Sequence, residues 1–158
     1  MTRPPGTPNP AMERADGRTL RLSTAQLDTA RLRQLLVFER TLRAGAPAGA
    51  TPEEVAHSYT AALTASGLDA EEVEAPLALL RRFGANRCIR AHLADRLVTL
   101  EGKAATDASA SEQTGEIRRR MAALDDALRV REDPETLTAL EANAAEILSL
   151  FAGAVHDG

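Results

Sequence analysis

The sequence predicts an all-α protein, built as an antiparallel bundle of about five helices that ends in a helical hairpin. Its 158 residues include 31 Ala and 21 Leu but only 6 Val and 3 Ile, so strong helix formers far outnumber the residues that favour strands. Apolar residues also recur at spacings of three and four over most of the chain, which is the period of an amphipathic helix. The length suits one domain with one hydrophobic core.

Residues 1–18 are expected to form a disordered tail, and residues 19–158 a single helical domain. Four of the first ten residues are proline, and the segment has no apolar stretch that could fold, direct secretion or anchor the chain in a membrane. No later stretch contains the ~18 uninterrupted apolar residues that a membrane span requires. The single cysteine, Cys88, cannot form an internal disulfide. We therefore expect a cytoplasmic protein without membrane contact.

The first helix is expected to begin at Ser23, whose side chain can cap it, and to end near Arg43. Its leucines spread over about half of the circumference of an ideal helix. One neighbouring helix covers a stripe only about 100° wide, so Leu32 and Leu36 require a second contact. We predict that Leu32, Leu36 and Arg40 bind a partner chain or a second copy. The alternative is that the two leucines lie between two helices of the bundle itself.

The second and third helices have clear local start signals. The second is expected to begin at Pro52, behind a Thr51 cap, and to end at Gly67 in a left-handed conformation. The third is expected to begin after the cap residue Asp69. Pro76 lies too deep in this helix for a simple start, which predicts a kink or a restart there.

The following stretch predicts a long helix whose apolar side changes along its length. Up to Gly84 the apolar residues share one face, and from Ile89 to Leu100 they share another, roughly opposite. Either the helix breaks near Gly84, or it continues and is buried first on one side and then on the other. We expect a continuous or bent helix, although a glycine inside a helix costs about 1 kcal/mol.

The C-terminal part is expected to contain a loop followed by the helical hairpin. Residues 101–115 are mostly small and polar, which is typical of a loop. One apolar stripe then runs over residues 117–128, and a second runs over residues 137–154 in a helix that begins at Pro134 behind the cap residue Asp133. Because the connection between the two stripes is short, they are predicted to pack against each other as an antiparallel pair.

Few residues in the sequence are suited to metal binding or catalysis. Cys88 and His92 share one helical face, also with Asp95, and Glu54 and His57 form a Glu-x-x-His pair. A structural zinc site needs four ligands and a di-iron bundle needs two such pairs, and the sequence supplies neither set. These residues are therefore only weak metal candidates, and Cys88 is expected to be at least half buried without a metal.

No catalytic motif is evident in the sequence. It has no phosphate-binding glycine loop, no serine nucleophile elbow and no zinc-protease signature. We therefore expect no catalytic residues, no cofactor and no enzymatic activity.

The charges are unevenly distributed along the chain. The net charge is −4, yet residues 44–76 contain six acidic and no basic residues, whereas residues 77–111 carry a net charge of +3. An arginine-rich surface can bind phosphate groups, which makes nucleic-acid binding an alternative function. Its candidate residues are Arg81, Arg82, Arg87, Arg90, Arg118, Arg119 and Arg120. Against it, aromatic residues that stack on bases are scarce, and a preference for GC-rich codons explains the arginine excess equally well.

The predicted function is that of a non-enzymatic helical module that binds other protein chains, as an oligomer, an adaptor or an accessory subunit of a larger assembly. Surplus apolar surface on the first helix supports this prediction. Two alternatives remain: a small nucleic-acid-associated subunit that uses the arginines, and a metal-binding helical bundle with a half-site in each chain.

Overall fold

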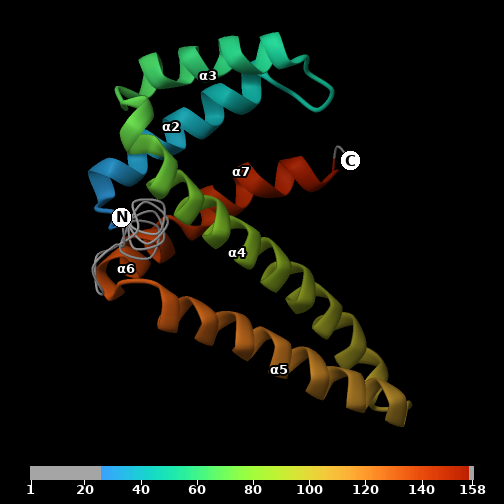
Figure 1. Ribbon diagram of the computed structural model, residues 1–158. Helices are drawn as coiled ribbons and strands as arrows, with labels where there is room; N and C mark the ends of the chain where they lie inside the picture. Colours follow the sequence, from blue (N-terminus) through green and yellow to red (C-terminus); the bar gives the residue numbers. More distant parts are fainter. Residues whose placement is uncertain (1–25, 157–158) are drawn as a thin grey trace, which may run out of the picture.

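The computed structural model describes residues 26–156, with side chains described up to residue 152, and this part of the chain contains helices and no strand (Figure 1). The predicted all-α class is therefore confirmed. The expected tail over residues 1–18 lies outside the described residues. The helices are α2 (Thr29–Gly45), α3 (Pro52–Ser66), α4 (Ala70–Ala104), α5 (Ala108–Arg131), α6 (Pro134–Ala142) and α7 (Ala144–His156).

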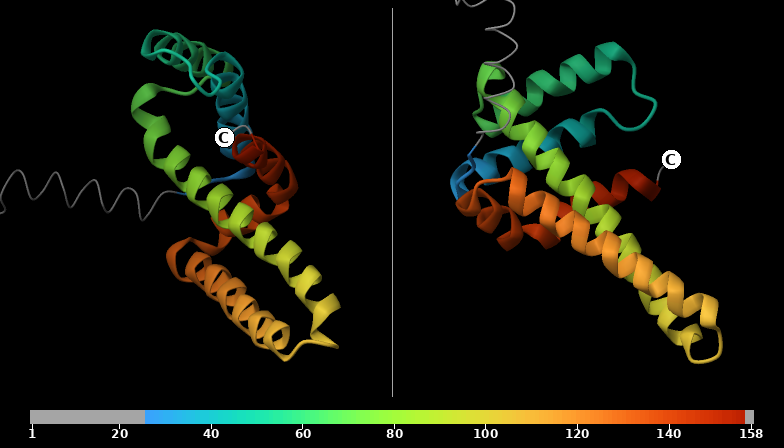
Figure 2. Two further views of the ribbon diagram at one scale, coloured as in Figure 1. Left: turned by 90° about the vertical axis from the view of Figure 1, so that its right-hand side faces the viewer. Right: turned by 60° about the horizontal axis from the view of Figure 1, so that its bottom comes forward.

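The helices form two pairs, α2 with α3 and α4 with α5, and the long helix α4 also contacts α2 and α7. Helices α2 and α3 pack side by side, α4 pairs with α5, and α7 packs across α4 (Figure 1). The distal parts of α4 and α5 extend beyond the other helices (Figure 2). We call residues 87–125, which comprise these two helix segments and their connection, the arm. The predicted bundle is thus present only in part, because the arm consists of two helices.

One apolar core joins the helices at the base of the arm. It contains Phe38 and Phe83 together with leucines from α2, α4, α5 and α6, and Ile147 of α7. Leu32 is 0% exposed and Leu36 is 2% exposed, and both belong to this core. The alternative that these leucines lie between helices of the same chain is therefore the one that the structure supports, and the prediction of a partner contact at these two side chains is wrong.

The predicted start of the first helix is wrong where the structure describes it. Ser23 lies outside the described residues, but Leu27 and Asp28 are not helical, and α2 begins at Thr29. Asp28 is the cap, and its side chain accepts a hydrogen bond from the backbone N–H of Arg31. Leu27 is buried in the core, and its own N–H donates to Thr136 Oγ1 at 3.0 Å. This tertiary contact outweighs the earlier capping signal.

Helix α4 is continuous over 35 residues and passes through Gly84, as expected. The restart predicted at Pro76 is wrong, because this residue lies inside the same helix. Gly84 is buried where Phe151 of α7 meets the helix, and a Cβ atom at this position would lie 2.7–2.9 Å from the ring. The change of apolar side has a simple cause. Before Gly84 the helix packs on α2 and α7, and beyond it Leu93 is buried towards α5.

Three predictions for the C-terminal part are wrong. Residues 101–115 are mostly helical, and only residues 105–107 connect α4 to α5. Consequently α5 forms its antiparallel pair with α4, and the last two helices do not pair with it over their length. The expected last helix is also divided at Asn143, whose side-chain amide donates to the carbonyl of Ala139 at 2.9 Å. Side chains of Asn that bond the nearby backbone compete with regular helix in this way.

Candidate functional site

The structure does not bring the weak metal candidates together. Glu54 and His57 are exposed on α3, whereas Cys88 and His92 lie on α4. Within the described residues, no group of three or more His, Cys, Asp or Glu side chains is placed to hold a metal ion. Cys88 is partly buried, as predicted, and burial raises the pKa of its thiol while the positive charge of Arg43 acts in the opposite direction.

The residues predicted to bind a partner do not form a surface. Leu32 and Leu36 are buried in the core, and only Arg40 is accessible. The guanidinium of Arg40 forms an ion pair with Glu146 of α7.

Most of the arginines proposed for nucleic-acid binding form ion pairs with carboxylates of the same chain. Arg82 pairs with Glu132, which is itself buried, and Arg119 pairs with Glu116 on α5. Arg81 donates to the buried Glu39. The remaining pairs are Arg87 with Asp125 and Glu141, Arg90 with Asp125, and Arg118 with Glu101. All of these ion pairs except Arg119–Glu116 connect different segments of the chain, and the arginines lie at several separate places on the surface. The seven residues therefore do not form a single basic surface.

Glu39 is a buried carboxylate that the sequence analysis did not identify. It is 1% exposed and accepts hydrogen bonds from Arg43 Nε at 2.9 Å and from Arg81 Nε at 2.6 Å. A buried carboxylate requires such partners, because its desolvation is costly. Since both oxygen atoms are engaged by arginines of α2 and α4, we assign Glu39 a structural role.

One side of the arm is closed by ion pairs between its two helices. Asp125 of α5 accepts hydrogen bonds from Arg87 at 3.1 Å and from Arg90 at 2.9 Å, and Arg118 pairs with Glu101 nearer the tip. Burial by itself raises the pKa of Asp125, but the hydrogen bonds and charges of the two arginines outweigh it and hold the pKa below its usual value. This side of the arm is therefore occupied by contacts within the chain.

The other side of the arm is open and partly apolar. A shallow hollow lies between α4 and α5, and it is lined by Ile89, Leu93, Arg120, Ala123 and Leu124. Ile89 is 49% exposed although it is a large aliphatic side chain. Leaving such a side chain in water forgoes part of the roughly 1.5–3 kcal/mol that its full burial would contribute.

Ile89 belongs to an exposed stripe on α4, which we call the outer α4 face. The stripe repeats every three or four residues, except that the partly buried Ala78 interrupts the exposed positions. Its exposed members are Glu71, Glu74, Arg81, Ala85, Ile89, His92, Arg96, Thr99 and Lys103. The stripe begins with acidic residues, continues with Arg81, which pairs with the buried Glu39, has small and apolar residues at its middle, and ends with basic residues.

A second hollow borders the same face in the first half of α4. It lies between α3 and α4 and is lined by Tyr59, Ala70, Val73, Glu74, Leu77, Ala78 and Arg81. Tyr59 forms its wall on the α3 side and packs edge-on against Phe38, with the ring centroids 5.4 Å apart. The outer α4 face therefore has one hollow on each side of Ala85 along the helix.

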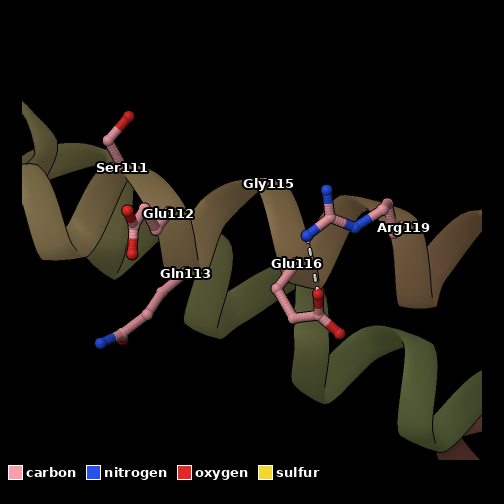
Figure 3. A pocket seen from close by; sticks show the side chains of 6 residues that line it. All are labelled: Ser111, Glu112, Gln113, Gly115, Glu116 and Arg119. Atoms are coloured by element: carbon pink, nitrogen blue, oxygen red, sulfur yellow. Dashed lines mark hydrogen bonds and ion pairs between the residues drawn. The ribbon is translucent and has the colours of Figure 1, made fainter.

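A further depression on α5 has no such features. Figure 3 shows its lining residues, Ser111, Glu112, Gln113, Gly115, Glu116 and Arg119, all from one helix. The first three side chains point in different directions, and Glu116 and Arg119 are joined to each other by a hydrogen bond of 2.7 Å (Figure 3). Binding sites place convergent polar groups around a concave apolar surface, and this depression does neither.

Sequence reasoning missed the outer α4 face because it searched for apolar stripes. The available signal was a stripe of polar and charged residues at the same spacing, acidic at Glu71 and Glu74 and basic at Arg81, Arg96 and Lys103.

None of the helices in the described part of the chain combines the length and the apolar character needed to cross a lipid bilayer. No family model matches the chain, and neither a curated protein nor a solved structure matches it.

Proposed function

We propose that the protein is a non-enzymatic interaction module that binds another protein chain through the outer α4 face. The observation that carries this proposal is the exposed stripe over residues 71–103, which is interrupted at Ala78 and is bordered by two partly apolar hollows. A straight helix of this length presents a surface about 50 Å long. Apolar hollows beside an exposed helix are the features that helical partners use.

The contacts on the rest of the arm support the choice of this face. Ion pairs from Asp125 and Glu101 occupy the opposite side of the arm, whereas Ile89 remains half exposed on the outer α4 face. The two-helix arm also extends away from the core, so a partner can approach it without displacing another helix (Figure 2). A partner that covers Ile89 and the hollow beside it therefore gains apolar burial without breaking an ion pair of the chain.

A photo-crosslinking experiment in the native cell tests the proposal. A crosslinkable amino acid replaces Thr99, which lies on the face, or Val98, which is 70% exposed but points about 100° away on the same helix. We expect a protein adduct at residue 99 and a much weaker one, or none, at residue 98. Equal adducts at both residues, or no protein adduct at residue 99, would contradict the proposal.

A further inference from the structure

We infer that the partner bound by the outer α4 face is a second copy of this chain, and that the two α4 helices pair antiparallel about a two-fold axis. This inference rests on the proposed function and names the partner of the same face. It follows from three properties of the face: the order of its charges, the size of its central residues and the position of its hollows.

The order of charges selects both the partner and its direction. Glu71 and Glu74 lie at the start of the face, and Arg96 and Lys103 lie towards its end. In an antiparallel pair the acidic end of each helix lies beside the basic end of the other, so opposite charges meet twice. A parallel pair would place like charges together at both ends, which is unfavourable.

The centre of the face is suited to close contact between helices. The midpoint of residues 71–103 falls between Ala85 and Ile89, which are both exposed. In the antiparallel pair, Ile89 of each copy packs over Ala85 of the other copy. A small side chain allows the helix axes to approach, and the large one fills the space that remains, as in ridges-into-grooves packing.

The two hollows lie on either side of the proposed axis along α4. The hollow beside α3 lies before Ala85, and the hollow that contains Ile89 lies after it. A two-fold axis near residue 87 places the first half of one helix next to the second half of the other. An antiparallel pair of identical surfaces closes on itself. The expected product is therefore a dimer and not a larger assembly of subunits.

Sedimentation of the purified full-length protein over about 1–100 µM gives the first test. We expect a dimer, and we expect its dissociation constant to rise with salt because the end contacts are ionic. Ile89→Arg should raise that constant at least tenfold, since the change occurs twice at the centre of a two-fold interface. A wild-type protein that stays monomeric throughout this range overturns the inference.

Two charge-reversal variants give a sharper test. Glu71→Lys with Glu74→Lys makes both ends of the face basic, and Arg96→Glu with Lys103→Glu makes both ends acidic. Each variant alone should dimerise at least tenfold more weakly than the wild type, and an equimolar mixture of the two should form a heterodimer. Circular dichroism establishes that each variant is folded, and Glu71→Lys alone replaces the first variant if it is not. Unchanged self-association, or a mixture that stays monomeric, overturns the inference.

The outcomes separate this inference from the proposed function. A monomeric protein that still crosslinks to a different protein through residue 99 overturns the inference and leaves the interaction module intact. A protein that neither dimerises nor forms a crosslink through this face overturns both.

Discussion

Gly84 lies in the middle of α4, where the ring of Phe151 rests on the helix backbone. A Cβ atom here would lie 2.7–2.9 Å from three ring atoms, including Cγ, which is close to the main chain of α7 and cannot swing away freely. On the ring of Phe151 the guanidinium of Arg43 lies 4.5 Å from the centroid, a cation–π distance. The glycine therefore serves the contact between α4 and α7 and does not mark a helix break.

Replacing Gly84 by alanine should lower the free energy of unfolding by about 1–2 kcal/mol. Overpacking of this kind costs about 1–3 kcal/mol, and the better helix propensity of alanine returns at most about 1 kcal/mol. Gly115→Ala is the matched control, because Gly115 is also inside a helix but a Cβ atom added there would have nothing within 4 Å. Urea unfolding should show a gain of up to about 1 kcal/mol for the control. Equal gains for both variants would refute this account of Gly84.

Asp125 is the residue whose ionisation should affect stability. Burial raises its pKa and the two arginines lower it, with a net decrease relative to the usual value. A carboxylate with a lower pKa in the folded state stabilises the protein above its unfolded pKa. That stabilisation is lost as the pH falls through the pKa of the folded state.

Asp125→Asn should therefore destabilise the protein by a constant amount above about pH 5, and the difference should shrink below about pH 4, where the unfolded-state carboxyl titrates. Asp126→Asn is the control, because Asp126 and its partner Arg129 are both largely exposed and such pairs contribute little. Urea unfolding of the three proteins between about pH 3 and pH 7 measures the effect, with these limits set by the same titration. A difference that stays constant to the lowest pH would contradict the assignment.

The arm is the element that depends least on the main core. Its buried apolar residues Leu93, Ala110 and Ile117 lie outside the core cluster and form a seam between two helices only. Ion pairs on one side reinforce this seam, but ion pairs exposed to water add little free energy. Such a region opens locally at a lower free energy than the core does.

Hydrogen exchange followed by mass spectrometry should therefore find weaker protection in residues 93–117 than in α2 and the first half of α4. The reason is the smaller apolar area buried around the backbone hydrogen bonds of the arm. Measurements at high dilution avoid any protection by a second copy. If protection is uniform along α4, then the arm unfolds together with the core and this description is wrong.

The whole molecule depends on one apolar core, to which all the described helices contribute residues outside the arm. Leu32 and Leu36 of α2 are fully buried in it, next to leucines of α4 and α6. Truncating one buried leucine to alanine costs about 2–5 kcal/mol, and domains of this size are stable by only about 5–15 kcal/mol. These two leucines therefore contribute to folding.

Leu32→Asp combined with Leu36→Asp should unfold the protein, because two charges would be buried without partners. Ile89→Asp is the matched control, since Ile89 is a large aliphatic residue that is half exposed on the outer α4 face. Circular dichroism of dilute protein at ambient temperature should show loss of helix only for the first variant. A folded double variant would show that α2 can be released from the core.

Local sequence alone determined the helical class and several helix ends. Thr51 and Pro52 begin α3, Gly67 ends it with φ = 72°, and Asp133 caps α6, all as predicted. Asp69 precedes α4 as expected, although its side chain makes no capping hydrogen bond. These features depend on groups within about four residues of each other, so a short window of sequence contains the physical cause.

Tertiary structure decided the start of α2, the pairing of α5 and the position of the outer α4 face. Leu27 leaves the helix because the core and Thr136 hold it, and Thr136 is 109 residues away in the chain. The Leu- and Ala-rich stripes of the several helices are alike, so local pattern could not show that α5 pairs with α4 and not with the helices after it. Which stripes meet depends on the apolar area buried by the whole arrangement. The exposed stripe on α4 is the side that no other helix of residues 26–156 covers.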